Sequence, residues 1–518
     1  MLEKFLNNRL FVLYIIPFLI GLLSVFSFQP YNFSVINFLI LPIIFYLIVY
    51  INKKSKSTFR KKPYRKNLFT FGCLFGFGFY LSGISWITNS LTFDKNFEIL
   101  IPFALILIPL FLSFFIGLAI LLIGPFLNYN ISSIFIFSAA LGCSDYLRAK
   151  ILTGFPWNLW AYSVSESIEM LQILNTIGLY AYNLVVITVY TLPAFLFFRI
   201  TLIKKIFFLL SALIFISCIY IFGSYEINKN KNSINLSNEK INVKIISPNF
   251  DLKYGLTINE IKNKLEKLIK YSDPQDKKTL FVWPEGAFSG YSYDEVKQFK
   301  DIIKKNFNEN QYIIFGINKL NKKSGLFYNS LLLVNNEFEV IQQYNKQKLV
   351  PFGEFLPFES LLNSFGLKKI TEGHGSFQKG IKKSSIKFDN LNILPLICYE
   401  VIFTSFIQQA NEATNLIVNI SEDAWFGDTI GPNQHYVKSI FRAIENGTFL
   451  VRSANKGISA IIDNKGVVIK QLNINEAGNI ELDVPLINSK KNKNDLIFII
   501  LLITYLIIFY LYKKKYDK

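Results

Sequence analysis

The chain carries repeated apolar runs, each near the length that crosses a lipid bilayer. The first extends from Leu10 to about Phe28, and the others cover residues 34–51, 68–88, 99–123, 131–147, 174–198, 206–223 and 496–512. A membrane helix needs roughly 17–25 apolar residues. The run at 131–147 is the weakest, because it contains several serines and Asp145. The pattern predicts seven spans, a polar domain and an eighth span.

The first run is interpreted as a span that stays in the mature protein. It is long, and no small-x-small cleavage site follows it, which argues against a signal peptide. The chain of 518 residues is 51% hydrophobic, which is too apolar for a single soluble domain and long enough for two.

Basic clusters predict the orientation of the spans. Residues 52–67 contain eight lysines and arginines and no acid, and two further clusters occur at Arg199 with Lys204 and Lys205, and at Lys513–Lys515 with Lys518. A single transmembrane topology places all three clusters in the cytoplasm, as the positive-inside rule requires. The polar domain then lies on the far side of the membrane, which in a bacterium is the periplasmic side. The net charge of +19 is explained by these topology signals, so no nucleic-acid partner is expected.

The composition changes after the seventh run. We expect a transmembrane domain of seven helices over 1–228, a linker over 229–240, a domain of alternating strands and helices over 241–487, and a C-terminal transmembrane helix over 496–512. Short β-type runs such as 243–246 and 280–283 alternate with helical stretches such as 258–271, which predicts an α/β fold for the polar domain.

Cys398 is the one cysteine of the polar domain, because the other three lie inside apolar runs. It follows the apolar run Leu394–Ile397, which is typical of a buried strand. Without a cysteine partner in its domain, Cys398 is either an inert core thiol or a nucleophile.

Two further segments carry residues that could activate a thiol. Glu285 follows a strand and a proline, and Lys346 lies in a polar segment that also contains Lys348. A glutamate can accept the thiol proton, and a lysine can stabilise the oxyanion that forms when a thiolate attacks a carbonyl. Each residue alone also fits an ordinary structural role. With two histidines and no C-x-x-C pair, neither a metal site nor a cofactor is expected.

Four motifs together resemble those of a known family. They are Trp283-Pro284-Glu285, Lys346 with the run Leu349–Glu354, Cys398-Tyr399-Glu400 and the run Asp423–Gly427. With the membrane spans, the chain resembles the apolipoprotein N-acyltransferases, a family of the nitrilase or carbon–nitrogen hydrolase superfamily. The resemblance implies an αββα sandwich joined to a membrane domain of about eight helices.

The resemblance also implies roles for single residues. Glu285 would be the general base, Lys346 the oxyanion-stabilising residue and Cys398 the nucleophile, with Lys348 as the rival for the lysine role. Glu354 and Glu400 would be supporting carboxylates that position the lysine or the substrate amine. The remaining expected pocket residues are Tyr399, Asn329 and Trp425.

The implied reaction is a ping-pong acyl transfer in the bacterial inner membrane, by an enzyme expected to be a monomer. A phospholipid, with phosphatidylethanolamine as the expected donor, would acylate Cys398, and the amine of a diacylglyceryl-cysteine apolipoprotein would take the chain. One alternative is a membrane-anchored amidase or nitrilase, and another is a transporter or scaffold with an inactive domain. The chain departs from the family pattern at Glu422, Tyr254 and Lys456, which leaves substrate preference open.

Two apolar segments outside the motifs have two interpretations each. Trp157, in the loop after Asp145 and Arg148, either anchors a helix in an aromatic belt or forms a wall of a groove that admits lipid. The segment Phe355–Phe358, with Leu361, Leu362 and Phe365, either dips towards the bilayer as part of a lid or packs in the core.

Overall fold

The computed structural model describes residues 8–58, 63–235, 239–357, 376–381, 385–489 and 494–516. The chain separates into two compact units. The first, here called the helical unit, comprises Met1–Thr88, Glu98–Glu226 and Lys493–Lys518. The second, here called the α/β unit, comprises Asn89–Phe97 and Ile227–Asn492. The segment Asn89–Phe97 therefore groups with the α/β unit, although the sequence analysis places it in the transmembrane domain.

The helical unit has helical structure at all eight predicted positions. Six segments of the described chain are long and apolar enough to span a bilayer, while Phe11–Ser27 is shorter and α6 is more polar. The helices are α2 (Ile16–Leu23), α3 (Asn37–Thr58), α4 (Pro63–Ile84), α5 (Ile101–Ile123), α6 (Ile131–Lys150), α7 (Ile168–Leu171), α8 (Leu174–Thr191), α9 (Leu202–Asn235) and α16 (Asn494–Tyr516). Short helical segments extend or join them at Phe11–Ile15, Ser24–Ser27, Ser34–Ile36, Ser85–Phe93, Lys95–Leu100, Gly124–Phe126, Trp160–Val164 and Leu192–Phe197.

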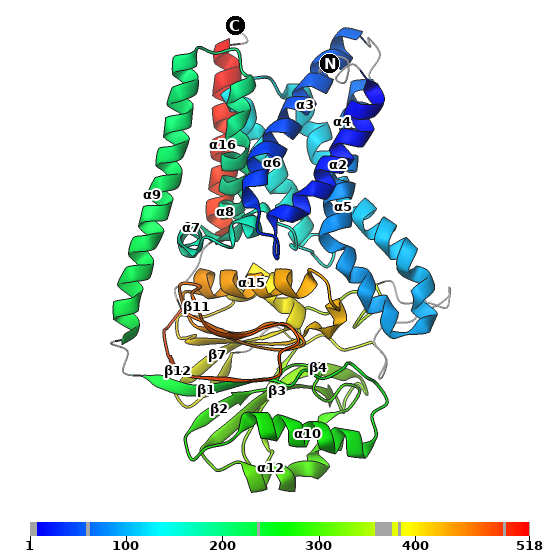
Figure 1. Ribbon diagram of the computed structural model, residues 1–518, viewed down its shortest axis with the longest axis vertical. Helices are drawn as coiled ribbons and strands as arrows, with labels where there is room; N and C mark the ends of the chain where they lie inside the picture. The colour runs from blue at the N-terminus through cyan, green and yellow to red at the C-terminus, as the bar shows by residue number, and fades with distance from the viewer. Residues whose placement is uncertain are drawn as a thin grey trace. The chain divides into compact units, whose positions relative to one another are not determined.

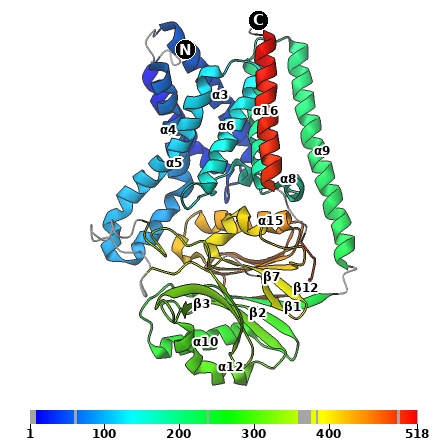
Figure 2. The same ribbon diagram turned by 180° about the vertical axis from the view of Figure 1, so that it is seen from behind.

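Glycines let the helices of this unit approach closely. A side chain at Gly21 of α2 would overlap the Phe75 carbonyl of α4, and one at Gly78 of α4 would overlap the Phe18 carbonyl of α2. Such small-residue contacts favour association inside lipid, where van der Waals packing replaces the hydrophobic effect. Figure 2 shows α4 beside its next neighbour in the chain, α5.

The loop after α6 folds into the helical unit. Arg148 pairs with Asp145 at 2.8 Å and also donates to the Phe155 carbonyl, which draws the loop inward. Trp157 is only 1% exposed, and its ring centroid lies 4.4 Å from that of Trp86. Both interpretations of Trp157 from sequence placed it at the membrane surface. The structure instead makes it part of the packed interior.

Trp157→Ala is therefore expected to destabilise the helical unit. Truncating a large buried aromatic side chain typically costs about 3–5 kcal/mol. The thermal unfolding midpoint of the detergent-solubilised protein should fall clearly below that of Leu152→Ala, whose side chain is 73% exposed in the wild type. Equal midpoints for the two variants would contradict the packing role.

Helix α9 shows that part of the predicted linker is wrong. The linker was expected over 229–240, but α9 continues to Asn235. No proline or glycine follows Gly223 in this helix. A helix that has already formed adds residues at low cost, so the Asn- and Lys-rich sequence remains helical.

The α/β unit contains two six-stranded sheets. The first has the order β12-β1-β2-β3-β4-β5 and the second the order β11-β10-β9-β8-β7-β6. In each sheet three neighbouring strands run parallel, namely β1, β2 and β3 in the first and β7, β8 and β9 in the second. The strands are β1 (Lys240–Ser247), β2 (Thr279–Val282), β3 (Gln311–Leu320), β4 (Phe327–Val334), β5 (Val340–Asn345), β6 (Ile386–Phe388), β7 (Leu391–Ile397), β8 (Leu416–Glu422), β9 (Leu450–Asn455), β10 (Ser459–Ile462), β11 (Val468–Leu472) and β12 (Gly478–Pro485).

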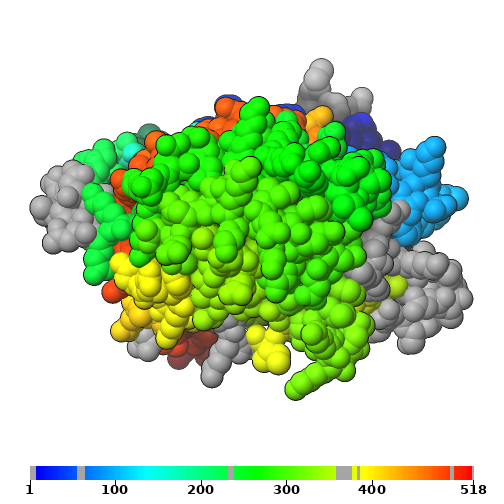
Figure 3. Space-filling model, turned by 90° about the horizontal axis from the view of Figure 1, so that it is seen from below, coloured from blue at the N-terminus to red at the C-terminus, as the bar shows by residue number. Residues whose placement is uncertain are grey.

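The two sheets face each other across an aliphatic core, with helices on their outer faces (Figure 1). Helices α10 (Ile258–Ser272) and α12 (Lys300–Asn306) cover the first sheet, and α15 (Gly431–Asn446) covers the second. Figure 3 shows the α/β unit from the side that α10 and α12 cover. This arrangement confirms the predicted αββα sandwich. The short remaining elements are α11 (Tyr293–Val296), α14 (Thr404–Ile407) and the turns Lys297–Phe299, Cys398–Ile402 and Asp423–Phe426.

The candidate residues follow the ends of particular strands. Glu285 comes just after β2, Lys346 directly after β5 and Cys398 directly after β7. Since parallel strands in a sheet end at a common edge, this topology brings loops from both sheets together.

Candidate active site

Cys398 occupies a strained turn at the end of β7. Its φ angle is +48°, which is uncommon for a residue other than glycine. A tight turn follows over Cys398–Ile402, and Glu400 holds it by accepting a hydrogen bond from the Ile397 N–H at 2.9 Å. Cys398 as a whole residue is half-buried. Strained backbone of this kind clusters at functional sites.

Glu285, Lys346, Glu354 and Asn329 form one buried cluster. The Lys346 ammonium lies 2.9 Å from Glu354 Oε1 and 3.3 Å from Glu285 Oε1. The Asn329 amide donates to the same two oxygens at 2.8 and 2.7 Å. Glu285 Oε2 accepts from the backbone N–H of Glu422 at 3.1 Å. All four residues are at most 8% exposed, so water competes little for these contacts.

The charges of this cluster act on Cys398. Burial, and then the negative charge of Glu285, raise the pKa of the thiol, while Lys346 lowers it by a smaller amount. Burial lowers the pKa of Lys346, but the carboxylates of Glu285 and Glu354 outweigh burial and hold this pKa above its ordinary value. The Cys398 thiol therefore lies within the electrostatic influence of both Glu285 and Lys346, an arrangement that suits base-assisted thiol attack.

The structure distinguishes the two candidate lysines. Lys346 points its ammonium between Glu285 and Glu354. Lys348 instead places its ammonium 4.8 Å from the centre of the Phe403 ring, and its backbone N–H donates to Glu400.

Glu400 is completely buried and holds backbone in place. It accepts from the Gln347 N–H at 2.7 Å and from the Tyr344 hydroxyl at 2.9 Å, in addition to its bonds with Ile397 and Lys348. Burial raises its pKa to about 7. This carboxylate was expected to position either the lysine or the substrate amine. Its contacts favour the first role, because they hold the segment that carries Lys346.

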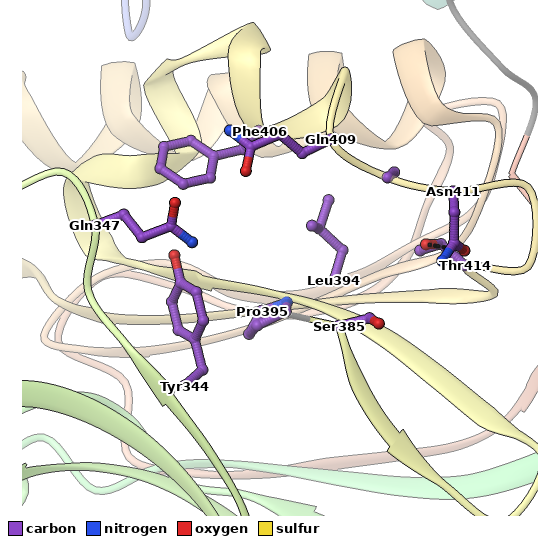
Figure 4. Close-up of a pocket in the computed structure, with 10 residues that line it drawn as sticks. Tyr344, Gln347, Ser385, Leu394, Pro395, Phe406, Gln409, Asn411 and Thr414 are labelled. Atoms are coloured by element: carbon purple, nitrogen blue, oxygen red, sulfur yellow. Dashed lines mark hydrogen bonds between the residues drawn. The ribbon is translucent and has the colours of Figure 1, made fainter. Parts of the chain in front are cut away.

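A cavity of about 360 Å³ lies on the other side of the residues that hold Glu400. Tyr344 and Gln347 form one wall, Leu394 and Pro395 of β7 the floor and Phe406 of α14 the roof (Figure 4). Its lining residues include no charged side chain.

A hydrogen-bonded network that the sequence does not reveal lies behind Cys398. The Ser421 hydroxyl bonds the Cys398 thiol and donates to Asp423 Oδ1 at 2.6 Å. Arg452 contacts Asp423 Oδ2 at 2.7 Å, and His435 Nδ1 lies 2.9 Å from Asp423 Oδ1. Although burial opposes ionisation, Arg452 and His435 hold the pKa of Asp423 below its ordinary value. The position of Ser421, two residues before the Asp423 motif, was the available signal.

Glu422 places a second carboxyl group beside Glu285. Its side chain accepts from the Asn455 amide at 2.9 Å and from the Ala424 N–H at 3.2 Å, and it lies against Gly286. Burial and the charge of Glu285 raise its pKa to about 8, despite the opposing effects of Asn455, Ala424 and Lys264. The sequence showed this position only as a departure from the family pattern.

Two expected pocket residues carry aromatic rings near this network. Tyr399 is half-buried and packs edge-on against Phe403, with ring centroids 5.0 Å apart. Trp425 is half-buried and contacts the ring of Phe93. Of the segment expected as a lid, Phe358, Leu361, Leu362 and Phe365 lie outside the described residues.

Comparison with known proteins identifies the family to which this chain belongs. The family model described as the apolipoprotein N-acyltransferase N-terminal domain matches residues 20–192, and the model described as carbon-nitrogen hydrolase matches residues 255–490. The apolipoprotein N-acyltransferase of Rickettsia typhi is 33% identical over 91% of this chain and 92% of its own length. The chain belongs to the apolipoprotein N-acyltransferase family. Other similar members are those of Rhizobium leguminosarum bv. trifolii, 31% identical over 90% of this chain and 88% of the relative, and Brucella melitensis, 30% identical over 90% and 89%.

For this member of the apolipoprotein N-acyltransferase family, Glu422 predicts a pH-dependent stability. Its folded pKa of about 8 lies above the ordinary value of 4.5, so the folded state keeps a proton that the unfolded chain releases. Stability is then lost as pH rises through this window. Glu422→Gln removes the titration, so its unfolding midpoint should fall less between pH 5 and pH 8 than that of the wild type.

The matched control for this experiment is Glu412→Gln, which changes an exposed glutamate. Its pH profile should follow that of the wild type. If Glu422→Gln and the wild type lost the same stability between pH 5 and pH 8, Glu422 would not hold the proton.

Proposed function

We propose that this protein transfers a fatty acyl chain from a membrane phospholipid, through a thioester on Cys398, to the free amine of a diacylglyceryl-cysteine apolipoprotein. The observation that carries the proposal is the burial of Lys346 between Glu285 and Glu354, with Glu285 and Lys346 both acting electrostatically on the Cys398 thiol. The names of the relatives and the apolar helices of the chain support a membrane acyltransferase.

In the first half-reaction, Glu285 accepts the thiol proton while Cys398 Sγ attacks the ester carbonyl of the donor. Lys346 has three N–H groups, and its contacts with Glu285 and Glu354 occupy two of them. The third can stabilise the oxyanion of the tetrahedral intermediate, a role typically worth about 3–4 kcal/mol. Collapse breaks the ester C–O bond, and Glu285 returns its proton to the departing lysophospholipid alkoxide.

In the second half-reaction, the amine of the apolipoprotein attacks the thioester carbonyl. Glu285 accepts the amine proton, Lys346 again faces the oxyanion, and the C–S bond breaks to release the amide. The departing thiolate recovers a proton from Glu285, which restores the resting site. Two steps through one covalent intermediate give ping-pong kinetics.

The proposed setting is the bacterial inner membrane, with the α/β unit on the periplasmic side. The three basic clusters support this orientation. We further propose phosphatidylethanolamine as the donor and a monomeric enzyme.

A membrane-anchored carbon–nitrogen hydrolase would use the same three residues. The apolar helices favour transfer between lipids, because a site that works within reach of the bilayer avoids extracting acyl chains at about 0.8 kcal/mol per methylene. Water as the final acceptor would release free fatty acid, whereas transfer consumes the apolipoprotein amine.

Cys398→Ser should abolish N-acylation of a diacylglyceryl-cysteine lipopeptide supplied with phosphatidylethanolamine. A carboxylate base activates a serine hydroxyl poorly, so serine is a much weaker nucleophile here than a thiolate. Product formation is measured by mass spectrometry of the lipopeptide, with Cys73→Ser as the control. Wild-type turnover by Cys398→Ser would remove the sulfur from the mechanism.

Loss of the two lysine side chains should have unequal effects on turnover. Lys346→Ala removes the ammonium between Glu285 and Glu354, and turnover should fall by at least about a hundredfold. Lys348→Ala removes a contact with the Phe403 ring and should stay within a few-fold of the wild type. The comparison is the single-turnover rate of lipopeptide acylation. The opposite ranking would exchange the two assignments.

A further inference from the structure

The segment Asn89–Phe97 has an unexpected place in the fold. In the sequence it lies between α4 and α5, two helices of the helical unit. By its contacts it belongs to the α/β unit. A connection between two apolar helices therefore contributes side chains to the unit that contains Cys398.

Asn89 binds the loop that carries Trp425. Its side-chain amide donates to the Trp425 carbonyl at 3.1 Å. The same amide lies against Gly427, where an added Cβ would come within 2.6 Å of the Asn89 nitrogen. Gly427 has a φ angle of +59°, so glycine suits both the backbone conformation and the close approach. The Trp425 loop is thus shaped to receive Asn89.

Phe93 brings an aromatic ring to the same place. It packs edge-on against Trp425, with ring centroids 5.1 Å apart and an interplanar angle of 72°. Tyr254, from the loop after β1, lies on Trp425 with a centroid distance of 6.3 Å. Phe93 is 38% exposed, while Trp425 and Tyr254 are half-buried. Three separate segments therefore build one apolar surface, here called the aromatic wall.

The aromatic wall is joined to the nucleophile by a short route. Trp425 lies in the turn Asp423–Phe426. Asp423 in that turn accepts a hydrogen bond from Ser421, whose hydroxyl bonds the Cys398 thiol. A group attached to Cys398 Sγ would thus begin close to the turn that presents Trp425.

We propose that Asn89 and Phe93 belong to the acyl-transfer site, with Phe93 completing an aromatic wall for the hydrocarbon chain of the donor and Asn89 positioning Trp425 within it. The ligand class is a long fatty acyl chain, because the three rings together offer uncharged, partly exposed surface. Each methylene group that leaves water strengthens the binding constant by about fourfold, so the aromatic wall should distinguish long acyl chains from short ones. This inference rests on the proposed function.

Phe93→Ala tests the chain contact. The readout is the ratio of kcat/KM for a phosphatidylethanolamine with hexadecanoyl chains to that for one with hexanoyl chains, both with the same lipopeptide acceptor. The ratio should fall about tenfold, through a higher KM for the long donor, and Phe93→Leu should restore most of it. Phe97→Ala, in the same segment, should leave the ratio unchanged.

An unchanged ratio in Phe93→Ala would overturn the proposal. If both kcat/KM values fell by the same factor, the unchanged ratio would indicate head-group recognition or misfolding. Alkylation of Cys398 by iodoacetamide separates these outcomes from a damaged site, because this small reagent needs no chain contact. Its rate should be the same in Phe93→Ala and the wild type.

Asn89 is tested as a positioning residue. Asn89→Ala should lower the same ratio by about threefold, and the double variant with Phe93→Ala should lose no more than Phe93→Ala alone. Additive losses would show that Asn89 does not act through the aromatic wall. If the wild-type protein acylated no lipopeptide with either donor, the proposed function would be wrong. If the wild type were active but Phe93→Ala had the same ratio of kcat/KM values, only this inference would be wrong.

Discussion

The site depends on one buried cation. The Lys346 ammonium is 2% exposed and lies between two carboxylates that share the Asn329 amide. Burying a charge this deeply is tolerable only when it is paired, and removing one partner of such a pair typically costs about 3–5 kcal/mol. Such a cluster is held in one arrangement, which keeps the proposed base, Glu285, and the proposed oxyanion donor, Lys346, in place for the Cys398 thiol. A preorganised arrangement of this kind needs little reorganisation during reaction.

The αββα fold supplies the strand ends that such a cluster requires. Glu285 follows β2 of the first sheet, and Cys398 follows β7 of the second, so the site draws on both sheets. Buried polar residues then hold the loops. Glu400 accepts hydrogen bonds from four residues in two segments of the chain, and Asp423 with Arg452 fixes the turn behind Ser421. The reacting groups are thus supported by a layer of charges that never reaches solvent.

The sequence predicted the fold because its signals are local, and the proposed catalytic residues were found from signals of the same kind. Apolar runs identified the helices, and short motifs identified Glu285, Lys346 and Cys398. It could not predict Ser421, Asn455 or Asn89, because each acts through a contact with a residue distant in the chain. The tryptophan at 157 was misplaced for the same reason: a Trp in a loop suggests an interface, and only the pairing of Arg148 with Asp145 and Phe155 shows that the loop folds inward. The extension of α9 to Asn235 was missed because an Asn- and Lys-rich composition does not show that a preceding helix continues through the segment.

In the proposed mechanism, Cys398 carries the acyl chain between two lipids. Peptide-mapping mass spectrometry of the purified protein, after incubation with phosphatidylethanolamine and no acceptor, should detect this intermediate. The peptide that contains Cys398 should carry a single fatty acyl adduct, which hydroxylamine removes as it removes a thioester and which is lost when a lipopeptide amine is added. An unmodified Cys398 peptide, or an adduct on another residue, would contradict it.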